Sequence, residues 1–150
     1  MNMKAKIREI GKQGRGREEL LAVLGEAREV YGCLAPEVIV ELAAGLDLPV
    51  GEVYGVATFY SFLSTRPRGR NIIRICKSIP CFLKDSQVII DTVAGALDIQ
   101  PGETTADNRF SFELTNCIGA CDKAPAMMVN HRVYGGLTPA EITRILAEHK

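Results

Sequence analysis

The segment at positions 66–70, RPRGR, constrains the fold more than any other feature, because the pattern of apolar residues changes there. Proline and glycine interrupt regular structure, and three like charges in so short a stretch repel one another. Before this segment apolar residues recur every three or four positions, as in helices, whereas after it β-branched runs and alternation indicate strands. We therefore predict a mobile arm over residues 1–16, a small helical bundle over 17–65 and a second domain over 71–150.

The region before the break predicts three short helices. The first ends near Gly32, the second begins at Pro36, and the third follows Pro49. Helices of about a dozen residues are not stable alone, so they must pack on one another or on a partner. Their repeating apolar positions are Leu20, Leu24, Ala27 and Tyr31, then Ile39, Leu42, Ala43 and Leu46, and then Val53, Val56, Ala57 and Tyr60.

Four side chains of this helical region carry separate expectations. Tyr60 is in register with the third apolar stripe, so we expect it in the core. Phe59 and Phe62 point elsewhere and are available to a partner. Cys33 has no cysteine nearby, and we expect a free thiol that is buried or partly buried, since free cysteine behaves as a small hydrophobe.

The region after the break predicts a strand, a helix, three further strands and a final helix. Ile72, Ile73 and Ile75 form a β-branched run that leads into Cys76, which indicates a buried strand. Residues 110–115 alternate apolar with polar side chains, as a half-buried strand does. The helix between these strands, which Asp85 or Ser86 is placed to cap, has an apolar stripe at Val88, Ile89, Val93, Ala96 and Leu97.

The last part of the chain predicts a hairpin and a capped helix. Residues 126–129 and 132–134 read as strands that turn at Asn130-His131, and TPAE at 138–141 has the pattern of a capping box. The first strand, helix and second strand form a βαβ unit, so these strands should be parallel and joined by a right-handed crossover. We therefore predict an α/β fold class, with a small helical bundle followed by a thioredoxin-like βαβββα domain.

Four of the five cysteines follow the two strands of this βαβ unit. Cys76 and Cys81 come just past the end of the first strand, and Cys117 and Cys121 come just past the end of the second. Parallel strands end at the same edge of a sheet, which is where open α/β sheets usually build their sites. The four thiols are therefore expected to converge.

Four converging thiolates bind either Zn²⁺ or an iron–sulfur cluster. Both pairs have the short separation that is common in structural zinc sites, and their spacing differs from that of plant-type ferredoxins. Two features favour a cluster. A chain of this length does not need a metal to fold. The intervening residues, KSIP and IGA, are small or apolar and could shield a redox centre while backbone N–H groups approach its sulfurs.

The charge and hydropathy of the chain do not favour a nucleic-acid or membrane partner. Eighteen basic residues balance eighteen acidic ones, and there is no long basic stripe. No apolar run is long enough to cross a bilayer, so we expect no direct membrane insertion. The N-terminal sequence is basic and lacks the apolar stretch of a secretory signal, which predicts a cytoplasmic protein with reduced thiols.

Four motifs, in order and at family spacing, carry a resemblance that extends over about residues 17–148. They are EVYGVATFY at 52–60, RICKSIPC at 74–81, NCIGACDKAP at 116–125 and YGGLT at 134–138. With these motifs the chain resembles the thioredoxin-like [2Fe–2S] ferredoxin subunit of NADH:quinone oxidoreductase. It equally resembles the relatives of that subunit in NAD(P)-linked, electron-bifurcating hydrogenases and formate dehydrogenases.

The resemblance implies that Cys76, Cys81, Cys117 and Cys121 ligate one [2Fe–2S] cluster. It also implies an electron-transfer subunit without a catalytic site of its own, which exchanges single electrons with the flavin of a partner in an NAD(P)H-linked complex. FMN and NAD(P) are expected on that partner, and further iron–sulfur subunits are expected in the complex. The chain itself has no G-x-G-x-x-G after a strand and no phosphate loop.

Two other functions stay open at this point. The first is a zinc-stabilised interaction module without redox activity. The second is a thiol oxidoreductase, which is disfavoured because the chain has no C-x-x-C motif. Near the cysteines, Lys77, Lys84 and Lys123 are either solvated surface charges or cations that favour a reduced cluster.

Overall fold

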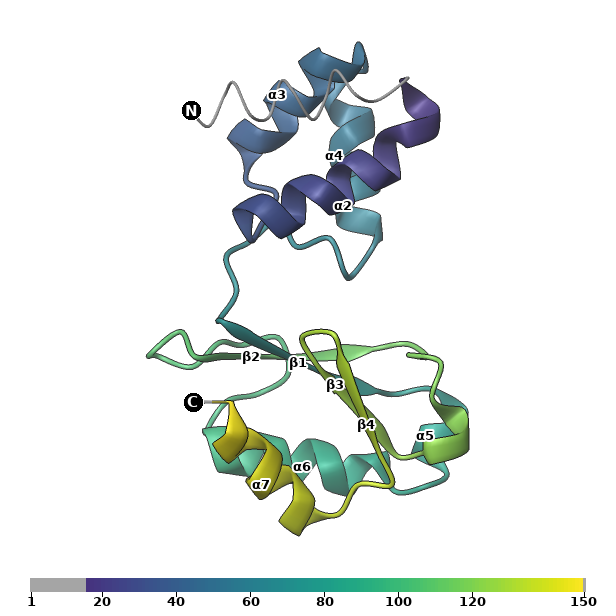
Figure 1. Ribbon diagram of the computed structural model, residues 1–150, viewed down its shortest axis with the longest axis vertical. Coiled ribbons are helices and arrows are strands. Elements are labelled where there is room, and N and C mark those ends of the chain that lie inside the picture. The colour runs from purple at the N-terminus through teal and green to yellow at the C-terminus, as the bar shows by residue number, and fades with distance from the viewer. Residues whose placement is uncertain (1–15, 150) are drawn as a thin grey trace. The chain divides into compact units, whose positions relative to one another are not determined.

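The computed structural model describes residues 16–149, so the predicted arm at 1–16 lies outside the described residues except for Gly16. The chain forms two compact units, one ending at Pro67 and the other beginning at Arg68. Figure 1 shows a helical unit and a unit built on a sheet. The finer boundaries, 17–65 and 71–150, stay predictions.

The first unit consists of short helices around one apolar core. They are the 3₁₀ turn η1 (Arg17–Glu19), α2 (Leu20–Tyr31), α3 (Pro36–Leu46) and α4 (Val50–Phe59). Buried side chains from α2, α3 and α4 form a single cluster, which includes Leu24, Ala27, Leu42 and Val53. With the exception of Tyr60, the apolar positions predicted for the three helices lie in this core or pack against it.

The prediction that Tyr60 belongs to the core is wrong. Helix α4 ends at Phe59, and Tyr60 takes an extended conformation instead of continuing the helical register. Its side chain is 42% exposed and meets the ring of Phe59 edge to face. Phe59 and Phe62 are exposed, and Cys33 is a partly buried free thiol, as predicted.

The second unit is a four-stranded mixed sheet with helices, which confirms the α/β fold class. Its strands stand in the order β2-β1-β3-β4, with β1 and β2 parallel and the other pairs antiparallel. The longer helices α6 and α7 lie on one face of the sheet, and the short α5 lies at one end of it (Figure 1). The elements are β1 (Asn71–Cys76), α5 (Ile79–Phe82), α6 (Ser86–Leu97), β2 (Phe110–Thr115), η2 (Cys121–Lys123), β3 (Ala126–Val129), β4 (Arg132–Gly135) and α7 (Pro139–Glu148).

The core of the second unit lies between the sheet and its two longer helices. Ile73, Ile75 and Phe112 of the strands join Val93 of α6 and Ile142 of α7 in one buried cluster. The stripe predicted for α6 is partly wrong, because Val88 and Ala96 are exposed. The buried face instead consists of Ser86, Ile89, Ile90 and Val93.

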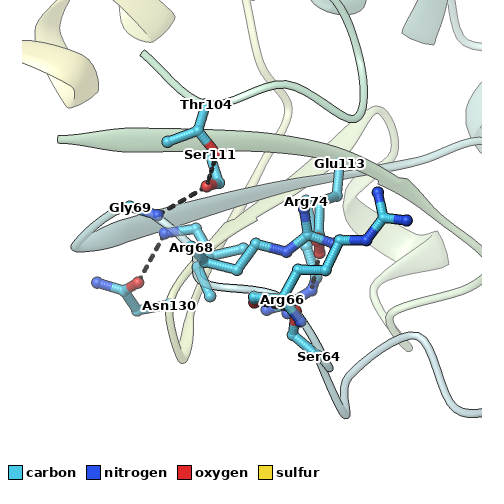
Figure 2. Close-up of polar contacts among 10 residues, drawn as sticks. Ser64, Arg66, Arg68, Gly69, Arg74, Thr104, Ser111, Glu113 and Asn130 are labelled. Atoms are coloured by element: carbon cyan, nitrogen blue, oxygen red, sulfur yellow. Dashed lines mark hydrogen bonds and ion pairs between the residues drawn. The ribbon is translucent and has the colours of Figure 1, made fainter. Parts of the chain in front are cut away.

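Strand β2 is buried on both faces, and the prediction of a half-buried strand is therefore wrong. Its polar residues Ser111 and Thr115 are 0% and 5% exposed. The Ser111 hydroxyl accepts a hydrogen bond from the backbone N–H of Gly69 at 2.8 Å and bonds the Thr104 hydroxyl at 2.6 Å (Figure 2). Local hydrogen bonds thus allow the polar face of β2 to leave water.

The helix ends of this unit agree with the predicted capping at α7 but not at α6. The Thr138 side chain and Glu141 form the reciprocal capping box at the start of α7. At α6, Asp85 occupies the N-cap position in a left-handed conformation, and its side chain makes no capping hydrogen bond. Ser86 lies inside the helix as a buried residue.

Candidate metal centre

The parallel pairing of β1 and β2 brings the two cysteine-bearing loops to the same edge of the sheet. Cys76 is the last residue of β1 and is in register with Thr115, the last residue of β2. The backbone N–H of Lys77 donates to the carbonyl of Thr115 at 2.9 Å, so the strands stay together to this point. Cys117 follows two residues later. The convergence predicted from topology thus has its basis in the strand register.

The first loop holds its two cysteines inside the protein. Cys76 and Cys81 are each 1% exposed. Cys81 lies in α5, a short helix that begins after Ser78 and that the pattern of apolar residues does not predict. Four residues are too few to show a helical repeat. The signal that could have found it is Ser78 followed closely by Pro80, a typical helix start.

The second loop presents its two cysteines at the surface. Cys117 and Cys121 are both exposed, and their Sγ atoms lie 3.4 Å apart. Gly119, with φ 78°, turns the loop so that its backbone N–H points at the Cys117 sulfur, also at 3.4 Å. Glycine adopts this conformation without steric cost. The loop therefore already directs a backbone donor at a sulfur, as a thiolate ligand requires.

The two loops share one small apolar cluster. Cys76 and Cys81 are buried together with Ala120 of the second loop and Ala126 of β3. Ile118 and Ala124, on either side of Ala120, pack against the same group. The second loop is therefore packed against the buried cysteines of the first, in surroundings of small and apolar side chains.

The thiols of this centre influence one another's ionisation. Burial opposes ionisation of Cys76, but hydrogen bonds from Ser78 and Cys81 outweigh it and hold the Cys76 pKa below its ordinary value. Burial and the bond to Cys76 raise the pKa of Cys81 to about 11. The hydrogen bond of Cys121 to Cys117, and the charge of that neighbour, raise the Cys121 pKa. In each pair one thiol is thus poised to donate to the other.

The arrangement of the cysteines is one of pairs. Cys76 bonds Cys81, and Cys117 lies against Cys121. Within residues 16–149, no three His, Cys, Asp or Glu side chains come together closely enough to hold a single metal ion. Two thiol pairs are what a two-iron cluster needs, since four cysteines hold it with two on each iron. The cysteines present therefore fit a two-iron cluster.

Gly135 of β4 supports the second loop through a close contact that sequence reasoning missed. A Cβ at this position would lie 2.3 Å from Lys123 Cβ and 2.6 Å from the Lys123 carbonyl oxygen. The next residue, Gly136, donates its N–H to that carbonyl at 2.6 Å. The YGG sequence was the available signal. Strand β4 therefore sets where the turn that begins at Cys121 lies.

The charged residues nearest the cysteines in sequence are at the surface. Lys77, Lys84 and Lys123 are all exposed, which agrees with solvated charges. An effect of these lysines on a cluster stays a prediction. Among the described residues, no helix is long and apolar enough to cross a membrane.

Comparison with known proteins gives consistent matches over most of the chain. The family model for thioredoxin-like [2Fe-2S] ferredoxins matches residues 6–150. HndA, a subunit of the NADP-reducing hydrogenase of Solidesulfovibrio fructosivorans, is 38% identical over 87% of this chain and 76% of its own. A subunit of the NADH-quinone oxidoreductase of Buchnera aphidicola is 38% identical over 96% of this chain and 91% of its own.

A further relative and a solved structure extend these matches. The corresponding NADH-quinone oxidoreductase subunit of Aquifex aeolicus is 34% identical over 89% of this chain and 83% of its own. The crystal structure of an NAD⁺-reducing [NiFe]-hydrogenase in the air-oxidized state superimposes with a TM-score of 0.77 at 31% identity. The match covers 87% of this chain but only 22% of the hydrogenase chain.

Proposed function

Because the chain belongs to the thioredoxin-like [2Fe-2S] ferredoxin family, we propose that Cys76, Cys81, Cys117 and Cys121 hold one [2Fe–2S] cluster. The chain is then the electron-transfer subunit of an NAD(P)-linked oxidoreductase complex. The observation that carries the proposal is the pair of facing thiols on each of two loops at one sheet edge. When bound, such a cluster supplies a centre that takes up and releases one electron at a time.

The chain's own residues hold, shield and expose this centre. Cys76 and Cys81 lie in the apolar cluster with Ala120 and Ala126, which keeps water from one side. Cys117 and Cys121 are exposed on the other side, which leaves a short path for an electron to a neighbouring protein. Protein groups of this kind set the potential and the position of a redox centre, whereas the cofactor supplies the chemistry.

The partner in this proposal is a flavin-bearing subunit that binds FMN and NAD(P) and takes the hydride. The names of the relatives, which are subunits of NADH-quinone oxidoreductase and of an NADP-reducing hydrogenase, support such a complex. Further iron–sulfur subunits belong to the same proposal. Exposed Ile79, Phe82 and Leu83 flank Cys81, and this apolar surface is suited to contact with another protein. The cytoplasmic location stays a prediction from the N-terminal sequence.

The second candidate is a zinc-stabilised interaction module. Zinc binds four cysteines tetrahedrally around one ion. Two facing cysteine pairs could also meet this requirement, and it is the match to a [2Fe-2S] family over residues 6–150 that favours the cluster. Metal analysis separates these two functions directly.

The test is to purify the protein without oxygen and to measure iron, acid-labile sulfide and zinc per chain. We expect about two irons and two sulfides, and a paramagnetic signal on reduction. Zinc without iron would contradict the proposal and support the interaction module.

Serine substitution of each of the four cysteines identifies the ligands. We expect Cys76→Ser, Cys81→Ser, Cys117→Ser and Cys121→Ser to lose the cluster or to change its spectrum, because each removes one thiolate from an iron. Cys33→Ser is the matched control, since Cys33 is a partly buried thiol in the helical unit, and it should keep iron and spectrum unchanged. A ligand variant with an unaltered cluster would remove that residue from the set.

A further inference from the structure

A network of three charged side chains lies inside the second unit. Arg74 of β1 is 2% exposed, and its Nε lies 3.1 Å from Oε2 of Glu113 on β2. Arg68, just before β1, places its Nη2 2.8 Å from the other carboxylate oxygen of Glu113. Figure 2 draws the three side chains together. Two guanidinium groups thus share one carboxylate in a place with little access to water.

The strand register places this network next to the cysteines. Arg74 precedes Cys76 by two residues, so both side chains belong to the same face of β1, about 7 Å apart along the strand. Glu113 is the register partner of Arg74, and Thr115 is that of Cys76. The charges therefore occupy the row of side chains immediately before the buried cysteine.

Stability alone is a weak reason for these charges. Removing two charges from water costs several kcal/mol per ion, and a well-packed apolar pair at such a position is often as stable or more so. The neighbours of Arg74 and Glu113 along the two strands on this face are buried and uncharged, namely Ile72 and Cys76 of β1 and Ser111 and Thr115 of β2. A buried charge acts over a longer distance than a solvated one, because salt and water screen it less. The location thus suits an electrostatic role toward the neighbouring thiolates.

We propose that Arg74 and Arg68 favour the reduced state of the centre, and that Glu113 limits their effect. The inference rests on the proposed function, since it requires the four cysteines to hold the cluster. Reduction adds one electron, taken from the reduced flavin of the partner, and no bond breaks. The thiolate-bound centre becomes more negative by one charge, which Arg74 stabilises and Glu113 opposes. These residues tune the potential without being ligands.

The experiment is a spectroscopic redox titration of the whole chain, purified without oxygen, with dithionite as the reductant. We expect Arg74→Gln to shift the midpoint potential to a more negative value and Glu113→Gln to shift it to a more positive one. The double variant, which removes one charge of each sign, should return toward the wild-type value. Arg74→Lys keeps the charge and should remain close to wild type.

Opposite signs for the two single variants are the result that a purely structural role would not give. Arg68→Gln is a second variant that removes a positive charge, at a less buried position where misfolding is less of a concern, because the Arg68 side chain is 24% exposed. It should also shift the midpoint potential to a more negative value. Unchanged potentials, or shifts of the same sign for Arg74→Gln and Glu113→Gln, would overturn the inference. Loss of the cluster from Arg74→Lys would also overturn it, since shape and not charge would then matter at this position.

Failure of the inference is distinguishable from failure of the proposed function. A wild-type protein without iron and sulfide contradicts the proposed function and this inference with it. If the wild-type protein holds an intact cluster and its potential is unchanged in Arg74→Gln, Glu113→Gln and Arg68→Gln, only the role of the charge network is contradicted.

Discussion

The hydroxyl of Ser111 satisfies two polar groups in the interior of the second unit. It accepts from the Gly69 N–H and bonds the Thr104 hydroxyl, while its own side chain is fully buried (Figure 2). The backbone passes closely here, because a Cβ at Gly69 would lie 2.8 Å from the carbonyl carbon of Phe110. Through the hydrogen bond from Gly69, Ser111 therefore holds the segment before β1 against strand β2.

Ser111→Ala should destabilise the protein by about 1–3 kcal/mol, because the Gly69 N–H would remain buried without an acceptor. Urea unfolding followed by circular dichroism measures the change. Thr143→Ala is the control. Its hydroxyl bonds the Pro139 carbonyl on the exposed side of α7, so its loss should stay within about 0.5 kcal/mol. Equal effects of the two variants would show that the buried hydrogen bond contributes nothing special.

At the residue scale, the sequence allows prediction of the cysteines but not of the side chains that surround them. Cysteines are few, and their position after two strands already implies convergence. The burial of Arg74 and Ser111 could not be predicted in this way, because alternation along a strand assigns a face without saying what covers it. The prediction for Tyr60 is wrong for a related reason, since its helical spacing continues one residue past Phe59, where α4 ends.

At the scale of elements, strand β4 positions the turn that carries Cys121. Gly135 of β4 lies against Lys123, the last residue of η2, with no room for a methyl group between them. Pairing with β3 fixes β4, because Gly135 is opposite Ala126. The cysteine turn thus lies between a fixed strand and the apolar cluster of the first loop.

Gly135→Ala should weaken the hold of the protein on iron, because the new Cβ would displace η2 and the cysteine at its start. We expect iron content to fall and the release of iron to a chelator to accelerate several-fold. Gly95→Ala is the matched control, since a Cβ there meets nothing within 4 Å. It should keep iron unchanged and add about 0.5–1 kcal/mol of stability in mid-helix. Iron release from Gly135→Ala at the wild-type rate would contradict the positioning role of β4.

The elements themselves were largely predictable, for physical reasons that also explain the exceptions. Long apolar repeats and the TPAE capping box identify the helices, and the β-branched run identifies β1. Helix α5 is only four residues long, so no periodicity could reveal it. The prediction for the face of α6 is wrong at Val88, because several apolar residues in a row permit more than one apolar stripe.

At the scale of the whole molecule, the apolar side chains form separate cores. One consists only of residues between Leu20 and Leu63, and the larger core of the second unit consists only of residues between Ile73 and Leu146. The thiols of Cys76 and Cys81 belong to a third, small cluster at the sheet edge, whereas those of Cys117 and Cys121 are exposed. A bound cluster would add four bonds where the packing is least extensive, and metal binding of this kind adds to the free energy of folding.

Removal of the cluster should therefore loosen the protein locally. In hydrogen-exchange measurements with and without iron, we expect amides in residues 77–83 and 117–124 to exchange at least tenfold faster in the iron-free protein, which corresponds to about 1.4 kcal/mol of lost local stability. Amides of α2 and α3 should keep their protection, because their core contains none of the four thiols. An equal loss of protection in α2 and α3 would contradict separate cores and would mean that iron binding supports the folding of the entire chain.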